Sequence, residues 1–407
     1  MKRRTILKGA GAVLVLAAGG GVWRASDRGV FSTGRGPAYE PWSTWRGDPS
    51  EGPLVYVRAA ILAANPHNTQ PWLFRLSASR LDLFADPRRS LGPLDPFRRE
   101  LYLGLGCALE NLHLAAQVDG FLANVAYLPD AASLEHAAAI GLTRAPAAPT
   151  GSRSPAATLH AAIPRRHTNR APYDMARPVS QAALQALGGL NDDPELMLFW
   201  FAEEGKRRRL AEVMVRATEA MRRDDEVMRA SAQWERFRWR EMQAFADGLT
   251  VDALGLSAKE RALAKWLPTP DPARVRDLWQ RATRERQTAT ASVFGVLAGL
   301  GGELTPRGAS GGGGVRATEA ARWLRCGRLW QRLHLWGTTQ DLAMQPMNQA
   351  IERAEREAVL GVEPTIGKAL EELIGEPRWK PLMIFRLGYP TLPALPTPRR
   401  SVHRVLA

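Results

Sequence analysis

Three short stretches concentrate polar and cationic side chains that suit anion binding. The stretch "NPHNTQPW" (65–72) holds Asn65, His67, Asn68 and Gln70; "RRHTNRAPYD" (165–174) holds Arg166, His167, Thr168 and Arg170; and "GYPTLPALPTPRRSV" (388–402) holds Arg399 and Arg400. Guanidinium groups bind phosphate bidentately, and a threonine hydroxyl with nearby backbone donors can complete the cradle. Together the stretches predict a site for a ligand with one phosphate and a polar chain. Each stretch alone is also typical of a solvated surface loop.

The sequence gives little support for a nucleotide-binding loop, a metal site or a catalytic side chain. The chain has no Walker A string and no G-x-G-x-x-G that opens a helix after a strand. None of its seven histidines forms an H-E-x-x-H or H-x-H pair, so no metal site is expected. Cys107 and Cys326 lie far apart without a C-x-x-C, which leaves only a single pairing between them open. No side chain is assigned as a catalytic nucleophile, acid or base.

The composition is that of a globular protein with a strong positive charge. Hydrophobic residues make up 45% and charged residues 24%, and the formal net charge is +14. No basic stripe interleaved with aromatics or zinc-ligand spacing concentrates this charge, so nucleic acid is not the expected partner. Phosphate ligands or an anionic membrane surface could use the same excess charge.

The N-terminus carries a targeting pattern over residues 1–30. The string "MKRRTILKGAGAVLVLAAGGGVW" has a basic start with Arg3 and Arg4 and then an apolar stretch from about residue 9 to 23, shorter than the roughly 20 residues that span a bilayer. It resembles a twin-arginine export signal, a route for proteins that fold before export, often with a bound cofactor. No clean A-x-A cleavage site follows, so a membrane anchor on the outer face and a cleaved, periplasmic form both remain open.

The rest of the chain predicts two packed parts separated by linkers. A linker is expected over 31–52, a first half over 53–143, a second linker over 144–157 and a second half over 158–407. Periodicity predicts helices within 54–65, 99–121, 179–189 and 324–343, two strands on either side of 77–79, and a strand at 195–201. An insertion at about 205–320 begins with charged helices that carry Met, Trp and Phe side chains and continues into a Gly-rich rear at 295–314. It is either a cover over a site or a surface excursion.

The two long predicted helices, within 99–121 and 324–343, can be aligned with each other. Placing Gly106 on Gly327 also aligns "LHL" at 112–114 with "LHL" at 333–335, in both cases ahead of a turn. The matches favour an internal duplication, although two unrelated amphipathic helices would also account for them. His113 and His334 are interpreted as packed or surface side chains rather than as ligands.

Three strings of the sequence together resemble one known family. "AANPHNTQPWLF" is similar to the Gln-Pro-Trp string of the nitroreductase superfamily, "RRHTNRAPYD" to its Arg-rich opening, and "GYP…PRRSV" to its closing element. The Arg-rich opening precedes Gln-Pro-Trp in that superfamily but follows it here. A duplication resolves the order if each half kept a different part. With the N-terminal pattern and "DLAMQPMNQAIE" (341–352), the arrangement most resembles the Acg-like branch. The resemblance implies an α+β nitroreductase-like fold with antiparallel sheets, flanking helices and a helical lid, in which the fused halves form a monomeric pseudodimer.

The resemblance also implies FMN as the cofactor and assigns residues to it. Arg166, His167, Thr168 and Arg170 would meet the phosphate and ribityl chain, with Arg399 and Arg400 on the phosphate; Asn65, His67, Asn68 and Gln70 would reach the ribityl chain and ring edge; and the backbone at Gln345 and Met347 would lie near the ring. Asn65-Pro66 departs from the family's Pro-Ser, which puts the roles of these two residues in doubt.

Two functions follow from the resemblance. One is an FMN-dependent oxidoreductase for small quinone-like or nitroaromatic acceptors, in which the flavin supplies the hydride chemistry. The other is a protein that stores or sequesters FMN beneath the lid. An exported protein has poor access to cytoplasmic NAD(P)H, which counts against a standard nitroreductase cycle. A basic, export-anchored scaffold without flavin is a third interpretation.

Overall fold

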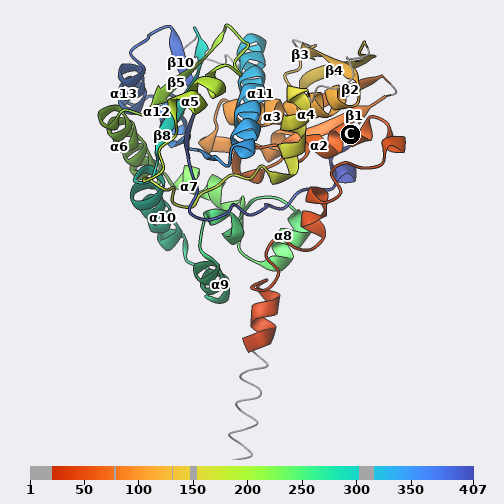
Figure 1. Cartoon of the computed structure of the whole chain (residues 1–407). Helices are drawn as coiled ribbons and strands as arrows, with labels where there is room; N and C mark the ends of the chain where they lie inside the picture. Colours follow the sequence, from red (N-terminus) through yellow and green to blue (C-terminus); the bar gives the residue numbers. More distant parts are fainter. Residues whose placement is uncertain (1–20, 78, 131, 147–153, 302–315) are drawn as a thin grey trace, which may run out of the picture.

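Two four-stranded antiparallel sheets, ordered β1-β2-β4-β3 and β5-β8-β10-β9, form the framework of the chain. The structure is a computed structural model that describes residues 21–77, 79–130, 132–146, 154–301 and 316–407. The strands are β1 (Trp72–Leu76), β2 (Arg80–Ala85), β3 (Phe121–Tyr127), β4 (His136–Arg144), β5 (Leu196–Phe201), β8 (Val293–Leu300), β9 (Ala343–Pro346) and β10 (Trp379–Gly388). With helices on their flanks, these sheets confirm the expected α+β class (Figure 1).

The two halves repeat one topology. In the first half the chain runs β1, β2, helix α3 (Arg99–Val118), β3 and β4; in the second it runs β5, β8, helix α11 (Ala317–Thr339), β9 and β10. Each strand occupies the same position in its own sheet as its counterpart. A long helix therefore follows the second strand of each sheet and leads into the edge strand.

Helices α3 and α11 pack against each other between the two sheets (Figure 1). One large apolar cluster continues across both helices and includes Trp72, Leu105, Leu324 and Trp330, so the halves share a core. Cys107 and Cys326 lie buried in this core as free thiols, so they do not pair. Burial raises the pKa of Cys326 to about 12.

Shorter helices flank this centre. Helices α2 (Leu54–Ala60) and α4 (Pro155–Ala162) both contact α3, and α5 (Gln181–Gly188) precedes β5. In the second half, α12 (Gln349–Leu360) and α13 (Thr365–Ile374) lie between β9 and β10. These two helices and α6 (Glu204–Met221) bury a second apolar cluster against the sheet, with Met214, Ile351 and Ile384 inside it.

A long excursion separates β5 from β8. After α6 it contains α7 (Asp225–Ala232), β6 (Glu235–Arg236), α8 (Trp239–Phe245), β7 (Leu249–Thr250), η7 (Val251–Leu254), α9 (Ala258–Trp266), α10 (Pro272–Arg281) and the π-helical turn η8 (Ala282–Thr288). Residues 293–300 fall within the range expected for the insertion, but they form β8, which pairs with both β5 and β10. The excursion therefore ends before residue 293, earlier than expected. Residues 302–314 of the expected Gly-rich rear lie outside the described residues.

The segment expected as a linker over 31–52 is packed structure instead. It forms the 3-10 helix η1 (Pro37–Trp42), which buries Ala38 and Tyr39, and a short turn η2 (Pro49–Glu51). The backbone N–H of Arg399 donates to the carbonyl of Ala38 (2.7 Å), so this segment binds the C-terminal tail. Its aromatic side chains are the reason that it packs.

Residues 1–20, which contain the paired arginines of the expected export signal, lie outside the described residues, as do 147–153 of the expected second linker. Residues 21–27 are helical and lead into the packed segment. Among the described residues, no helix combines the length and the apolar character needed to cross a bilayer.

Candidate functional site

A small cavity lies where the three predicted stretches meet. Its walls come from the turn at 64–68, the loop at 166–170, the excursion at Leu249 and the tail at 395–399. Seven of the predicted residues line it, namely Asn65, Asn68, Arg166, His167, Thr168, Arg170 and Arg399. Its volume of about 40 Å³ leaves room for only a few water molecules. A larger ligand therefore requires the segments that line the cavity to move outward.

Arg166 is the most deeply buried cation on the wall. It is 2% exposed, one Nη donates to the carbonyl of Leu62 (3.1 Å), and the other lies 3.4 Å from Nδ1 of His334. Its Nε has no hydrogen-bond partner among the described residues. Burial lowers the pKa of Arg166 to about 10, because no nearby carboxylate compensates the lost hydration.

Arg399 enters the cavity from the tail and is 3% exposed. Its guanidinium donates to Oδ1 of Asn68 and to the carbonyls of Pro398 (3.0 Å) and Ala63 (3.3 Å), and it lies over the ring of Trp42 at 4.8 Å. Its Nε is also unpartnered in the described structure. Burial first, and then the charge of Arg166, lowers its pKa well below the ordinary value.

These buried cations have no counter-charge of their own. Over the described ranges, no carboxylate lies within ion-pair distance of Arg166, Arg170, Arg399 or Arg400. Burying uncompensated charge is costly, and a bound anion removes that cost. The cavity is therefore electrostatically prepared for a phosphate or carboxylate.

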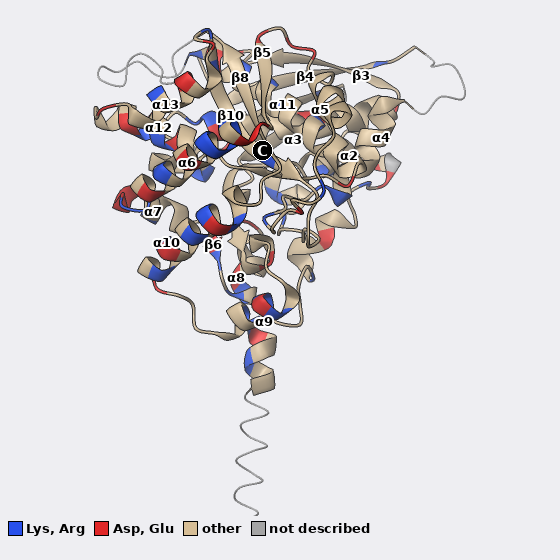
Figure 2. Ribbon diagram, turned by 60° about the vertical axis from the view of Figure 1, so that its left-hand side comes forward, with Lys and Arg blue, Asp and Glu red and all other residues tan. Residues whose placement is uncertain are grey.

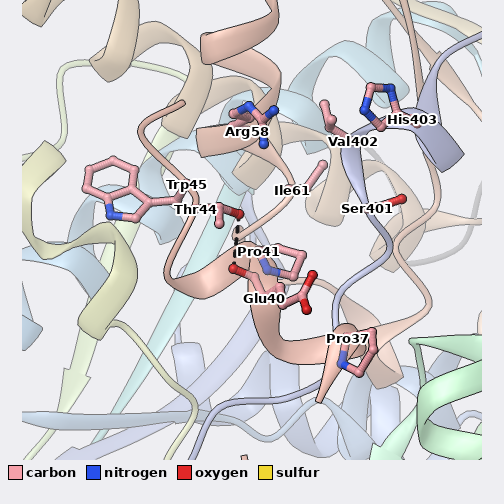
Figure 3. A pocket seen from close by; sticks show the side chains of 10 residues that line it. All are labelled: Pro37, Glu40, Pro41, Thr44, Trp45, Arg58, Ile61, Ser401, Val402 and His403. Atoms are coloured by element: carbon pink, nitrogen blue, oxygen red, sulfur yellow. Dashed lines mark hydrogen bonds between the residues drawn. The ribbon is translucent and has the colours of Figure 1, made fainter. Parts of the chain in front are cut away.

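A second cavity differs from the first in the charge of its lining. With a volume of about 150 Å³, it lies between η1, α2 and the C-terminal tail (Figure 3). Its lining residues are Pro37, Glu40, Pro41, Thr44, Trp45, Arg58, Ile61, Ser401, Val402 and His403. The arginine there, Arg58, donates to Glu51 at 2.6 Å. Its charge is already neutralised, so this larger cavity lacks the anion-binding character of the smaller one.

The turn at 65–70 is hydrogen-bonded to residues 246–248 of the excursion and to the C-terminal tail. His67, Asn68 and Gln70 adopt left-handed φ angles of 46°, 55° and 52°, a conformation that non-glycine residues rarely take except at constrained positions. Nδ2 of Asn68 donates to the carbonyls of Gly248 (3.2 Å) and Pro398 (2.9 Å). Nε2 of Gln70 donates to the carbonyl of Ala246 (2.8 Å). These bonds latch residues 246–248 of the excursion and the tail to the turn.

Two histidines of the site are neutral at physiological pH. Burial, and then the charges of Arg166 and Arg399, lower the pKa of His167 to about 3. Burial also lowers the pKa of His67 to about 4, against the attraction of Glu100. The ring of His167 meets Trp42 edge-on, with 4.5 Å between the ring centroids. A neutral imidazole beside two guanidinium groups adds no competing positive charge.

Five predicted residues do not line the cavity. Oε1 of Gln70 accepts from the backbone N–H of Arg400 (2.8 Å), and Arg400 returns a bond to the carbonyl of Gln70 (3.2 Å). Nε2 of His67 lies 3.3 Å from Oγ of Ser231. Farther away, Oε1 of Gln345 accepts from Nε of Arg386 (2.8 Å), and Met347 is buried in the second apolar cluster. Gln70, Arg400 and His67 hold the turn, the tail and the excursion together. Gln345 and Met347 belong to the second sheet and its core.

Sequence reasoning missed two neighbours of the site. Trp42 contacts Arg399 and His167 from the segment expected as a linker. His334 was expected as a packed or surface residue; it is buried and contacts Arg166. The only signal for Trp42 was a cluster of aromatics within a presumed linker. No group of histidine, cysteine or acidic side chains suited to a metal ion occurs in the described part of the chain.

Comparison with known proteins points in one direction. No family model matches the chain. Two curated Mycobacterium tuberculosis proteins, from strains CDC 1551 and H37Rv, are described as candidate NAD(P)H nitroreductases and are 40% identical to it over 114 residues. The similarity in sequence is to nitroreductases. The match spans 28% of this chain and about a third (32%) of the length of these relatives.

Solved structures give similar descriptions. The FMN-dependent nitroreductase NfnB of Mycobacterium smegmatis, in complex with NADPH, is 17% identical over 62% of this chain and 97% of its own, with a TM-score of 0.37. A Bacteroides fragilis nitroreductase with bound FMN is 13% identical over 60% of this chain and 94% of its own, with a TM-score of 0.32.

Proposed function

We propose that this chain is an FMN-binding, nitroreductase-like oxidoreductase of the Acg-like type, built as a monomeric pseudodimer. The observation that carries the proposal is the pair of buried arginines, Arg166 and Arg399, each with an orphaned Nε and no carboxylate partner in the described structure. The terminal phosphate of FMN supplies the anion that this pair lacks. The repeated topology of the two halves supports the pseudodimer.

Contributions from both halves support a site of this kind. The first half supplies Asn65 and Asn68, and the second supplies the loop at 166–170 and the tail. In the proposal, Arg166, Thr168, Arg170 and Arg399 hold the phosphate and ribityl chain, and the amides of Asn65 and Asn68 hold polar groups farther along. The flavin, when bound, supplies hydride transfer to a small quinone-like or nitroaromatic acceptor.

The second candidate function, storage or sequestration of FMN, is favoured by the latch. Asn68 and Gln70 hold residues 246–248, which lead into the cavity-lining Leu249, through side-chain to backbone bonds. A cover bound in this way excludes acceptors as well as water. The export signal expected over residues 1–30 supports a location outside the cytoplasm, either periplasmic or anchored to the membrane, where NAD(P)H is scarce. The electron donor would then differ from NAD(P)H.

The test is FMN affinity in the variant Arg166→Met. Methionine keeps much of the volume and removes a buried charge that has no partner, so the fold should be retained. Loss of a charge-assisted bond should weaken FMN binding by roughly 10- to 100-fold, since such bonds contribute about 1.5–3 kcal/mol. Quenching of FMN fluorescence measures the dissociation constant. Arg58→Met, at the arginine already paired with Glu51, is the matched control. Unchanged affinity in Arg166→Met would remove the phosphate assignment.

A further inference from the structure

Helix α9 buries a charged side chain and exposes two large apolar ones, unlike an ordinary surface helix. The ammonium group of Lys265 is buried, while Leu263 is 55% and Trp266 is 39% exposed. Nζ of Lys265 donates to the carbonyl of Gly29 (3.0 Å) and to Oγ1 of Thr33 (3.1 Å) and pairs with Asp252 (2.8 Å). Burying an ion while exposing large apolar side chains costs free energy in water. The arrangement therefore indicates a surface that meets something other than water.

A second segment extends this surface. The helical residues 21–27 pack against α9, because Nε of Arg24 donates to the carbonyl of Trp266 (3.2 Å) and a Cβ on Gly21 would lie 3.5 Å from the Trp266 ring. Both views place these residues beside α9 at the end of the molecule farthest from the sheets (Figures 1 and 2). The exposed apolar residues of the two segments and of the residues that directly follow them are Val22, Trp23, Phe31, Leu263, Trp266 and Leu267, which we call the α9 tip.

The charges around the α9 tip are predominantly positive. Arg24, Arg28 and the exposed Lys259 form no salt bridge within the described residues. The nearby carboxylates are already used: Asp252 pairs with Lys265, Asp27 with Arg240, and Glu260 caps α9. Tryptophan and leucine flanked by free cations match the interface of an anionic bilayer, where indole rings favour the headgroup level.

The chain itself points to the same occupant. Twenty residues precede Gly21, and the apolar stretch from about residue 9 to 23 leads directly into the α9 tip. A segment of this kind brings whatever follows it close to a membrane surface. We propose that the α9 tip docks into the interface of an anionic phospholipid membrane, with Trp23, Leu263 and Trp266 at headgroup depth and Arg24, Arg28 and Lys259 on the phosphates. This inference is independent of the proposed flavin function.

A fluorophore on the full-length chain tests the docking. Cys107 and Cys326 are 2% and 0% exposed, so in the folded protein an environment-sensitive dye reacts only with an introduced thiol. The variant Leu263→Cys carries the dye at the α9 tip. Val362→Cys, 47% exposed, is the matched control, because it connects α12 and α13, two helices that lie remote from α9 in both views. Phe31→Cys, 67% exposed, provides a second tip position in case the first variant is poorly folded.

The dyes are read with vesicles of phosphatidylcholine and phosphatidylglycerol. We expect emission at 263 and 31 to shift to the blue, to rise severalfold and to be quenched by a lipid-borne quencher, with no change at 362. The effect should weaken in high salt, because screening reduces attraction to the phosphates. If the tip dyes do not respond although the protein co-floats with the vesicles, the N-terminal segment alone binds lipid, and the proposal is overturned. Emission already blue-shifted without vesicles would overturn it too, since residues 1–20 or a second copy would then cover the tip.

Discussion

Gly106 of α3 and Gly327 of α11 face each other where the two helices cross. A Cβ on Gly106 would lie 2.1 Å from the carbonyl oxygen of Leu324, and a Cβ on Gly327 would lie 2.1 Å from the carbonyl oxygen of Leu103. Each contact reaches the residue three positions before the opposite glycine, so the crossing is symmetric. This is the geometry of a two-fold interface in which one patch meets its own equivalent. The internal duplication predicted from the alignment of the two helices would place a symmetric crossing at this point.

The variant Gly106→Ala should destabilise the fold strongly. The added methyl cannot fit, because it would meet backbone rather than a movable side chain, and separating the helices would disrupt the shared core. We expect a loss of about 3 kcal/mol or more in the free energy of unfolding, at the upper end for overpacking. Urea denaturation measures it. Gly188→Ala, at a helical glycine with open space around it, is the control and should be neutral or stabilising by up to about 1 kcal/mol. Equal effects at both positions would contradict the tight crossing.

The variant Gln70→Ala should loosen the cover without removing the anion site. It deletes the side-chain bonds to the carbonyl of Ala246 and to the N–H of Arg400 but leaves Arg166 and Arg399 in place. Both association and dissociation of FMN should become faster, and the dissociation constant should change less than either rate. Stopped-flow fluorescence measures the two rates. Gln117→Ala, at an exposed position of α3, is the control. Unchanged rates in Gln70→Ala would show that the latch does not limit access.

The depressed pKa of His167 predicts a loss of stability in acid. Its folded-state pKa is about 3, mainly because of burial, against an ordinary pKa of 6.5. As the pH falls below about 6.5, the unfolded chain takes up a proton that the folded chain refuses, so stability is lost progressively down to about pH 3. The variant His167→Gln lacks this contribution. Relative to the variant, the wild type should lose about 2 kcal/mol between pH 7 and pH 4.5.

Urea denaturation at the two pH values gives this difference. The control Gln117→Ala, at an exposed position that carries no titratable group, should keep the pH dependence of the wild type. If His167→Gln and the wild type lose stability in parallel between pH 7 and pH 4.5, His167 is not held neutral by its surroundings.

Much of the framework could be predicted from periodicity, because its elements bury one face. The hairpin β1–β2, helix α3 and strand β5 all form where the alternation or the helical spacing of apolar residues indicated. Strand β8 was missed because two glycines made it look flexible. A Cβ on Gly295 would lie 2.2 Å from the Phe385 ring, and one on Gly299 would lie 2.6 Å from Arg322. These glycines mark the close approach of large side chains, which a single sequence cannot reveal.

The sequence predicted that the three stretches meet, because residue type alone indicates which side chains suit an anion. Arginines and amides in three separated stretches do meet at one cavity, because the turn at 65–70, the loop at 166–170 and the tail converge between the halves. Local sequence does not indicate which member of a stretch points inward. Asn68 lines the cavity, whereas Gln70, two residues later, holds the lid and the tail. Gln345 and Met347 were placed by resemblance alone, and the second sheet and its core hold both of them.

The most direct test of the flavin site is the absorbance spectrum of the full-length protein after incubation with FMN and removal of free flavin. The account predicts a retained flavin band in the wild type and its loss in Arg166→Met. Anaerobic NADPH then separates the two functions: bleaching indicates an accessible oxidoreductase, and a stable yellow colour indicates an occluded flavin or a different donor. A well-folded wild-type protein that emerges colourless would contradict the central claim that the buried arginines hold the FMN phosphate.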